Sequence, residues 1–381
     1  MWFVTGEMLQ IVFIATLAYL FGVRISERLG FKKPFLNASV LISLFVLFSY
    51  SELLCAFYMA YTVITYIALV LIPKKTHRKA YFVTMCGLFV LPFFAYRFLN
   101  LGVDLASILL LVGFSYNMLK AVDALFFVYY TDMHIPFFNY ANFLLFFPVF
   151  TSGPILRYRD FAREWDNLKP ATLTDISEGV QRFIIGLFKK VVALELLNRI
   201  FNQLTALPEY HFWSSISILA LGYLILYFDL SGYSDMAIGI GRMIAFKIPE
   251  NFNKPWTAAS FTQFWRKWHI SLSDWIREHI FVVVQGKKLS KYQGALIGFC
   301  TMIIMSFWHE FSFMMILDGA YMGFFLVIEN LFSLSTFNTR KEKKYKYIIR
   351  AAAVSFFFAI NALGFSLEPV QIMAVLKGLI N

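Results

Sequence analysis

Apolar runs of bilayer length, separated by short polar segments, constrain this chain more than any other feature. They fall at about 2–23, 35–50, 53–72, 80–97, 101–118, 121–151, 178–205, 212–245, 293–308, 311–335, 348–365 and 367–380. About 20 helical residues cross the hydrocarbon core of a bilayer. We therefore expect an all-α polytopic membrane protein with roughly 10–12 membrane helices. The 121–151 run is expected to be broken, and the 2–23 run to be a first span rather than a cleaved signal peptide.

Composition supports a membrane protein and decides its class of partner. Hydrophobic residues make up 59% of the chain and charged residues 15%, against roughly 45–50% and about 25% in soluble domains. The net charge of +11 does not indicate nucleic acid, because the basic residues cluster in loops such as 74–79 and 340–344. Such loops are typical of the cytoplasmic side of membrane proteins. The lipid bilayer is therefore an expected partner, and nucleic acid is not.

Several common kinds of site are not visible in the sequence. Cys55, Cys86 and Cys300 lie in separate apolar runs, and their spacing matches neither a disulfide framework nor a metal motif. We find no nucleotide-binding glycine loop, no nucleophile elbow and no cluster with metal-ligand spacing. No internal repeat or low-complexity linker divides the chain. We expect a single membrane-embedded domain over residues 1–381 with no metal site.

His309 is the first candidate for chemistry. Apolar residues flank it for most of a span, from Met302 to Met315. An ionisable side chain at membrane depth is costly, so it usually faces a cavity and serves function. A neutral imidazole is also the form that a general base needs. The alternative is a structural histidine that forms hydrogen bonds between helices.

His269 is the second candidate, and it lies in the least apolar part of the chain, residues 246–292. If its surroundings form one helix, Trp265, His269 and Leu272 share a face. From this pattern alone, an interfacial amphipathic helix is favoured over a cavity lining. The other histidines are interpreted as solvated or interfacial: His77, His134, His211 and His279.

Around these two histidines the sequence resembles the bacterial membrane-bound O-acyltransferase (MBOAT) family. Four segments carry the resemblance: FFPVFTSGPILRY at 146–158, YFDLSGYSDMA at 227–237, residues 249–272 ending in FWRKWHISL, and Trp308-His309 followed by Gly319 and Gly323. Their order and spacing match the family over about residues 140–325. The resemblance implies an O-acyltransferase whose helices surround a central pore.

The resemblance also implies roles for individual residues. It assigns His309 as the catalytic residue and His269 as a second functional residue. The substrate-pore candidates are Asp229, Ser231, Tyr233, Asp235, Asn253, Trp265, Arg266, Trp268, Ser273, Trp308 and Glu310. Ser306 and Glu310 stand where family members commonly carry glycine, which allows a closer approach of backbone or substrate. Glu310 could instead orient the imidazole, and an inactive homologue is the alternative.

Two branches of the family share features with the chain. Its length and first segment resemble the DltB-like branch, which passes D-alanine towards teichoic acids. Its second and third segments resemble the AlgI- and PatB-like branch, which passes acetyl groups to exported polysaccharide or peptidoglycan. We favour D-alanyl transfer, mainly on length. Either branch implies a bacterial cytoplasmic-membrane protein, an accessory envelope acyl-transfer protein and a cell-envelope glycopolymer as acceptor.

The implied donor is a cytoplasmic thioester, either a phosphopantetheine carrier protein or acetyl-CoA, with no permanently bound cofactor. An acidic carrier protein would dock on a basic surface. The candidates for that surface are Lys74, Lys75, Arg78, Lys79, Lys287, Lys288 and Lys291. The competing hypothesis is a transporter without catalysis, in which Asp229 and Asp235 relay protons. Transporters often show repeated halves, so the lack of a repeat counts against it.

Overall fold

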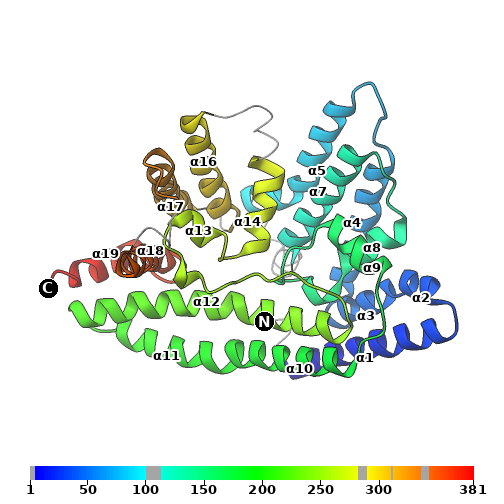
Figure 1. Cartoon of the computed structure of the whole chain (residues 1–381), viewed down its shortest axis with the longest axis horizontal. Helices are drawn as coiled ribbons and strands as arrows, with labels where there is room; N and C mark the ends of the chain where they lie inside the picture. Colours follow the sequence, from blue (N-terminus) through cyan, green and yellow to red (C-terminus); the bar gives the residue numbers. More distant parts are fainter. Residues whose placement is uncertain (1–4, 100–112, 282–289, 310–311, 336–342) are drawn as a thin grey trace. The chain divides into compact units, whose positions relative to one another are not determined.

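The computed structural model describes residues 5–99, 113–281, 290–309, 312–335 and 343–381. In these ranges the chain is helical and forms no strand, so the predicted all-α class is confirmed (Figure 1). The contacts group the chain into two compact units. Unit 1 comprises Met1–Leu187 and Tyr233–Pro249, and unit 2 comprises Phe188–Gly232 and Glu250–Asn381. A single domain over residues 1–381 stays a prediction.

Unit 1 is built from the first nine labelled helices and the end of a tenth. They are α1 (Gly6–Arg28), α2 (Lys32–Ala38), α3 (Val40–Tyr50), α4 (Glu52–Val70), α5 (Arg78–Leu99), α7 (Phe114–Thr131), α8 (Phe137–Leu145), α9 (Tyr158–Asp166), most of α10 (Leu173–Phe188) and the last residues of α12 (Phe212–Met243). The chain leaves α7 at Asp132, whose φ is 59°, and re-enters a helix after Pro136. The 121–151 run is therefore broken, as predicted.

The core of unit 1 is aromatic, and it includes the first family-like segment. Phe161 and Trp165 stack with centroids 5.0 Å apart, and Phe146 contacts Phe246 at 4.8 Å. A buried lysine, Lys120, donates from Nζ to the carbonyl of Leu144 at 2.6 Å. Lysine is almost never fully buried without a partner. Here its ammonium meets a carbonyl at the C-terminal end of α8, where intrahelical donors run out.

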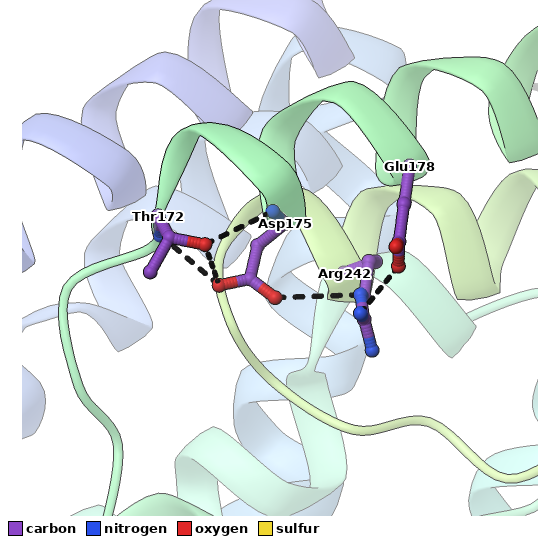
Figure 2. Close-up of polar contacts among 4 residues, drawn as sticks. All are labelled: Thr172, Asp175, Glu178 and Arg242. Carbon is purple, nitrogen blue, oxygen red and sulfur yellow. Dashed lines mark hydrogen bonds and ion pairs between the residues drawn. The ribbon is translucent and has the colours of Figure 1, made fainter.

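The last part of α12 packs closely against α10 in unit 1. A Cβ on Gly239 would lie 2.6 Å from the backbone nitrogen of Phe183, so the two helices approach backbone to backbone. Figure 2 shows a cluster of ion pairs and hydrogen bonds at one end of this contact. Arg242 contacts Asp175 at 3.4 Å and also pairs with Glu178, while Asp175 and Thr172 cap the start of α10.

Unit 2 holds the remaining helices. They are α11 (Leu194–Thr205), the first part of α12, α13 (Phe261–Trp265), α14 (Ile270–Ile276), α16 (Lys291–His309), α17 (Phe313–Leu331), α18 (Lys344–Leu363) and α19 (Pro369–Gly378), with π-helical turns at Lys189–Ala193 and Arg277–Phe281. The short helices α13 and α14 lie in the polar 246–292 segment, where the sequence lacks a long apolar run.

Six helices in the described ranges are long and apolar enough to cross a membrane: Gly6–Arg28, Lys32–Tyr50, Glu52–Val70, Phe212–Met243, Phe313–Leu331 and Lys344–Leu363. The chain is a multi-pass membrane protein. The predicted 178–205 run is not among the six, because charged residues such as Arg182, Lys190 and Glu195 interrupt α10 and α11. Most of the predicted 101–118 run lies outside the described residues.

Candidate functional site

His309 is the last residue of α16, and α17 begins at Phe313. The imidazole has edge contacts with two aromatic rings. Its centroid lies 4.7 Å from that of Trp308 and 5.9 Å from that of Phe365, which follows α18. Aromatic neighbours on two sides limit the orientations of the imidazole. A general base must be positioned in this way against the proton it removes.

The position of His309 depends on close packing between α16 and α17. A Cβ on Gly319 would lie 2.6 Å from Ile303 Cα and 2.7 Å from the Met302 carbonyl oxygen. A Cβ on Gly323 would lie 3.1 Å from Phe299 Cα. Small residues at this spacing let membrane helices pack backbone to backbone. The two glycines of the fourth family-like segment therefore fix α17 against the helix that ends in His309.

His269 has a left-handed backbone conformation, with φ 45° and ψ 52°. α13 has ended at Trp265, and α14 begins directly after His269. The predicted single helix with Trp265, His269 and Leu272 on one face is therefore wrong. Left-handed residues other than glycine are uncommon and carry strain, although histidine tolerates this region better than most.

Asn251 holds this strained turn in place. Its carbonyl accepts the backbone N–H of Ile270 at 2.9 Å, and its side-chain oxygen accepts the N–H and hydroxyl of Ser271 at 3.1 and 2.9 Å. In the same stretch, the backbone N–H of Asn253 donates to the Lys267 carbonyl at 2.9 Å. Two segments of the third family-like block thus pair on either side of His269.

The electrostatic surroundings keep His269 neutral. The residue is 3% exposed and lies outside the six apolar spans. Burial, and secondly the charge of His309, lower the pKa of His269 to about 3. His309 belongs to the same unit, and its charge contributes to this shift. At neutral pH His269 is an uncharged imidazole, which can donate one hydrogen bond and accept another.

Trp268, which precedes His269, packs in an aromatic cluster and is not among the residues that line the cavity of unit 2. It is 4% exposed and stacks on Phe264 with centroids 5.5 Å apart. It also contacts Phe358 of α18 at 4.7 Å and Tyr223 of α12 at 5.8 Å. This packing supports the turn that carries His269, so the structure gives Trp268 a supporting position.

A cavity of about 580 Å³ lies in unit 2 next to this turn. Three of the predicted pore residues line it: Trp265, Arg266 and Ser273. On the other side it is lined by Met302 and Met305 of α16. Met305 lies one helical turn before His309 and thus on the same face of α16. The cavity therefore borders the face of α16 that carries His309, but neither His309 nor His269 is among its lining residues.

The cavity also carries positive charge. Arg266, Arg277 and Lys291 line it. Arg277 pairs with Asp274 at 2.9 Å, and Lys291 donates to Ser333 Oγ at 3.0 Å. Basic side chains in a partly apolar cavity suit a ligand with an anionic end and an uncharged chain.

The four pore candidates on α12 separate between the two units. In unit 2, Asp229 forms an ion pair with the buried Lys190 of the π-helical turn, and Ser231 is buried. In unit 1, Asp235 Oδ1 accepts a hydrogen bond from Arg182 Nε at 2.6 Å and forms an ion pair with the same guanidinium, and Tyr233 lies in the same unit. Both aspartates are therefore engaged in ion pairs.

Other predicted positions lie away from the cavity or outside the described residues. Asn253 has an exposed side chain and is not among the residues that line the cavity. Glu310, Lys287 and Lys288 lie outside the described residues. In the proposed carrier-docking set, Lys74, Lys75 and Lys79 are exposed, whereas Arg78 pairs with Asp132. His279 is buried and stacks on Trp275, with centroids 4.3 Å apart, and its interfacial location stays a prediction.

A polar pair beside His309 was not predicted from the sequence. Ser306 Oγ donates to Asp318 Oδ2 at 3.1 Å, which joins α16 to α17. The signal was present, because Asp318 is the one acidic residue between Phe313 and Ile328. Ser306 was noted only for replacing a family glycine. The described ranges contain no group of three or more His, Cys, Asp or Glu side chains that could hold a metal ion.

Comparison with known proteins identifies the family. The chain is 34% identical over 259 residues to the probable alginate O-acetylase AlgI of Pseudomonas putida, covering 63% of this chain and 53% of the relative. It is 35% identical over 210 residues to the peptidoglycan O-acetyltransferase of Helicobacter pylori, covering 52% and 38%. It is 31% identical over 227 residues to the teichoic acid D-alanyltransferase of Bacillus subtilis, covering 56% and 55%.

The chain thus spans about half the length of the AlgI relative and over a third of the peptidoglycan enzyme. The profile of the membrane-bound O-acyltransferase family matches residues 115–367, a range that contains both candidate histidines and the whole lining of the cavity. On this evidence the chain belongs to the membrane-bound O-acyltransferase family.

Proposed function

We propose that this protein transfers an acyl group from a thioester donor to a hydroxyl of a bacterial cell-envelope polymer, at the cytoplasmic membrane. The observation that carries the proposal is the cavity in unit 2. It is lined by Trp265, Arg266 and Ser273 on one side and by the helix that ends in His309 on the other. A thioester with an anionic handle suits its basic and apolar lining.

The acyl group in this proposal is acetyl rather than the D-alanyl group favoured by chain length. Identity is 34% to the alginate O-acetylase and 35% to the peptidoglycan O-acetyltransferase, against 31% to the D-alanyltransferase. Length is a weak guide because the chain matches only part of each relative. The basic lining also supports acetyl-CoA, whose nucleotide end carries several phosphates that arginine binds well.

In the proposed reaction, His309 accepts the proton of the acceptor hydroxyl. The hydroxyl oxygen attacks the thioester carbon, a carbon–oxygen bond forms, and the carbon–sulfur bond breaks. The leaving thiolate then takes the proton from His309, which restores the neutral imidazole. His269, neutral because burial lowers its pKa to about 3, donates a hydrogen bond to the carbonyl oxygen as negative charge develops there. The strained, clamped turn at His269 fixes that donor before the substrate arrives.

The test is acyl transfer by purified protein in lipid nanodiscs. The donor is labelled acetyl-CoA, and the acceptors are alginate oligosaccharide and soluble peptidoglycan fragments. His309→Ala is expected to lose at least ~10²-fold in rate, the lower end for general-base catalysis. Glu195→Gln is the matched surface control, because Glu195 pairs only across one turn with Arg199 on an exposed face. Normal transfer by a well-folded His309→Ala protein would eliminate the general-base role.

A second experiment addresses the donor and the non-enzymatic alternative. Labelled D-alanyl carrier protein is offered in place of acetyl-CoA, with glycerol-phosphate oligomer as acceptor. Transfer from the carrier alone would replace acetyl by D-alanyl and leave O-acyl transfer standing. Failure with both donors, together with proton flux in proteoliposomes that depends on Asp229, would favour the transporter hypothesis.

A further inference from the structure

Asp318 and its neighbours form a polar cluster that the proposed reaction does not yet use. Asp318 lies in α17, a helix apolar enough to span the membrane. Its Oδ2 accepts a hydrogen bond from Ser306 Oγ at 3.1 Å. Asn361, on α18, lies close to the same carboxylate, because a Cβ on Gly364 would lie 3.2 Å from the Asn361 backbone carbonyl oxygen and 3.4 Å from Asp318 Oδ1. A carboxylate in such a helix is costly to keep and usually serves a function.

The cluster faces the same region as His309. Ser306 precedes His309 by three positions on α16, so the two side chains share a helix face. On the other side, a Cβ on Gly364 would lie 3.4 Å from Asp318 Oδ1. The next residue is Phe365, whose ring contacts the His309 imidazole. The Asp318 carboxylate and the His309 imidazole are thus bracketed by the same two segments of unit 2.

Within the cluster, one buried hydrogen-bond acceptor has no partner among the described residues. Asn361 is 6% exposed, and its Oδ1 has no hydrogen-bond partner among the described residues. This amide oxygen is an acceptor, so a donor group of a bound molecule would satisfy it. A buried acceptor without a partner is unfavourable, so an open one beside a carboxylate indicates a donor-bearing ligand.

We propose that Asp318 and Asn361 form a substrate subsite, which binds a hydroxyl or ammonium group of the molecule that reacts at His309. The inference rests on the proposed function and names the recognition chemistry within it. Two sources supply such a donor group. One is the sugar hydroxyl next to the acylated position of the acceptor, and the other is the ammonium of an aminoacyl donor. An acetyl group carries neither, so in an acetyltransferase the subsite binds the acceptor.

The test uses Asp318→Asn and Asn361→Ala in nanodiscs, with Glu195→Gln as the acid-to-amide control on an exposed surface. We expect KM for alginate oligosaccharide or peptidoglycan fragments to rise roughly 10-fold or more, the effect of losing a hydrogen bond to a charged group. KM for acetyl-CoA should stay within about twofold of the wild type, because the acetyl group has no donor for the subsite to accept. Binding of the same acceptors is measured by calorimetry, so that recognition is followed without turnover.

The outcomes separate the two sources and the two proposals. A rise confined to acceptor KM, with weaker acceptor binding, supports the hydroxyl, whereas a loss confined to D-alanyl carrier supports the ammonium. Both variants behaving like Glu195→Gln in kinetics and calorimetry would overturn the subsite and leave a cluster that holds only water. If the wild type transfers from neither donor, the enzymatic proposal fails. In that case, weaker acceptor binding by Asp318→Asn than by the wild type would still support the subsite. Unchanged acceptor binding would refute it.

Discussion

Gly319→Ala should loosen the contact that positions His309. The new Cβ would lie 2.6 Å from Ile303 Cα and 2.7 Å from the Met302 carbonyl oxygen, whereas ordinary carbon contacts begin near ~3.5 Å. Both neighbours are backbone atoms, so no side chain can rotate away. The α16–α17 pair must separate by about 1 Å, and overpacking of this kind costs roughly 1–3 kcal/mol. In a generic helix the same substitution would instead stabilise, because alanine has the higher helix propensity.

The expected readouts are a melting temperature lowered by roughly a few degrees and a lower turnover number. A displacement of ~1 Å near reacting groups can cost ~10²-fold in rate, and His309 lies less than two turns beyond Ile303. Gly87→Ala in α5 is the control, since a Cβ there meets nothing within 4 Å. Thermal unfolding and acetyl transfer are measured for both variants. Equal stability and turnover for the two would refute the close-packing argument.

Three further changes test other contacts. Lys120→Met should lower unfolding free energy by ~1–3 kcal/mol, because it leaves the Leu144 carbonyl unmet at the end of α8; a neutral result in thermal unfolding would count against that cap. Glu329→Gln should cost ~0.5–2 kcal/mol and reduce transfer, since the carboxylate accepts the first N–H groups of α13. His269→Asn tolerates the left-handed backbone but removes a histidine with a folded pKa near 3. Between pH ~6.5, the pKa of an unfolded histidine, and a pH of about 3, the unfolded state binds a proton on this imidazole and the folded state does not. Lowering the pH through this range should therefore reduce the stability of the wild type more than that of the variant.

Hydropathy was sufficient to predict the fold class, because the fold class depends on the lipid that surrounds each helix. Apolar runs must be helical in lipid whatever their neighbours are, so the all-helical chain and the break near Pro136 were predictable. The prediction of a membrane span at 178–205 was wrong because it rested on the number of apolar residues. It ignored the charged residues that make α10 and α11 amphipathic. Periodicity is informative when one face of a regular helix is buried.

The geometry of the site depends on contacts between distant residues, which no local pattern contains. The helical spacing around His269 suggested one helix. Instead, Asn251 accepts hydrogen bonds from the N–H groups of Ile270 and Ser271, and the helix is interrupted at His269. Similarly, the isolated aspartate at position 318 was visible, but its neighbours Ser306 and Asn361 come from two other helices. The residue types with chemistry could be found from the sequence. Their partners required the structure.

Ser306 replaces a glycine of the family pattern, and its contacts argue against an inactive homologue. Here the serine hydroxyl donates to Asp318, and a membrane helix retains that carboxylate in spite of its cost. Around it the glycine contacts between α16 and α17 and the clamped turn at His269 are intact. A compensated pair of polar residues next to an unaltered Trp308-His309 sequence is better explained by altered substrate recognition than by decay.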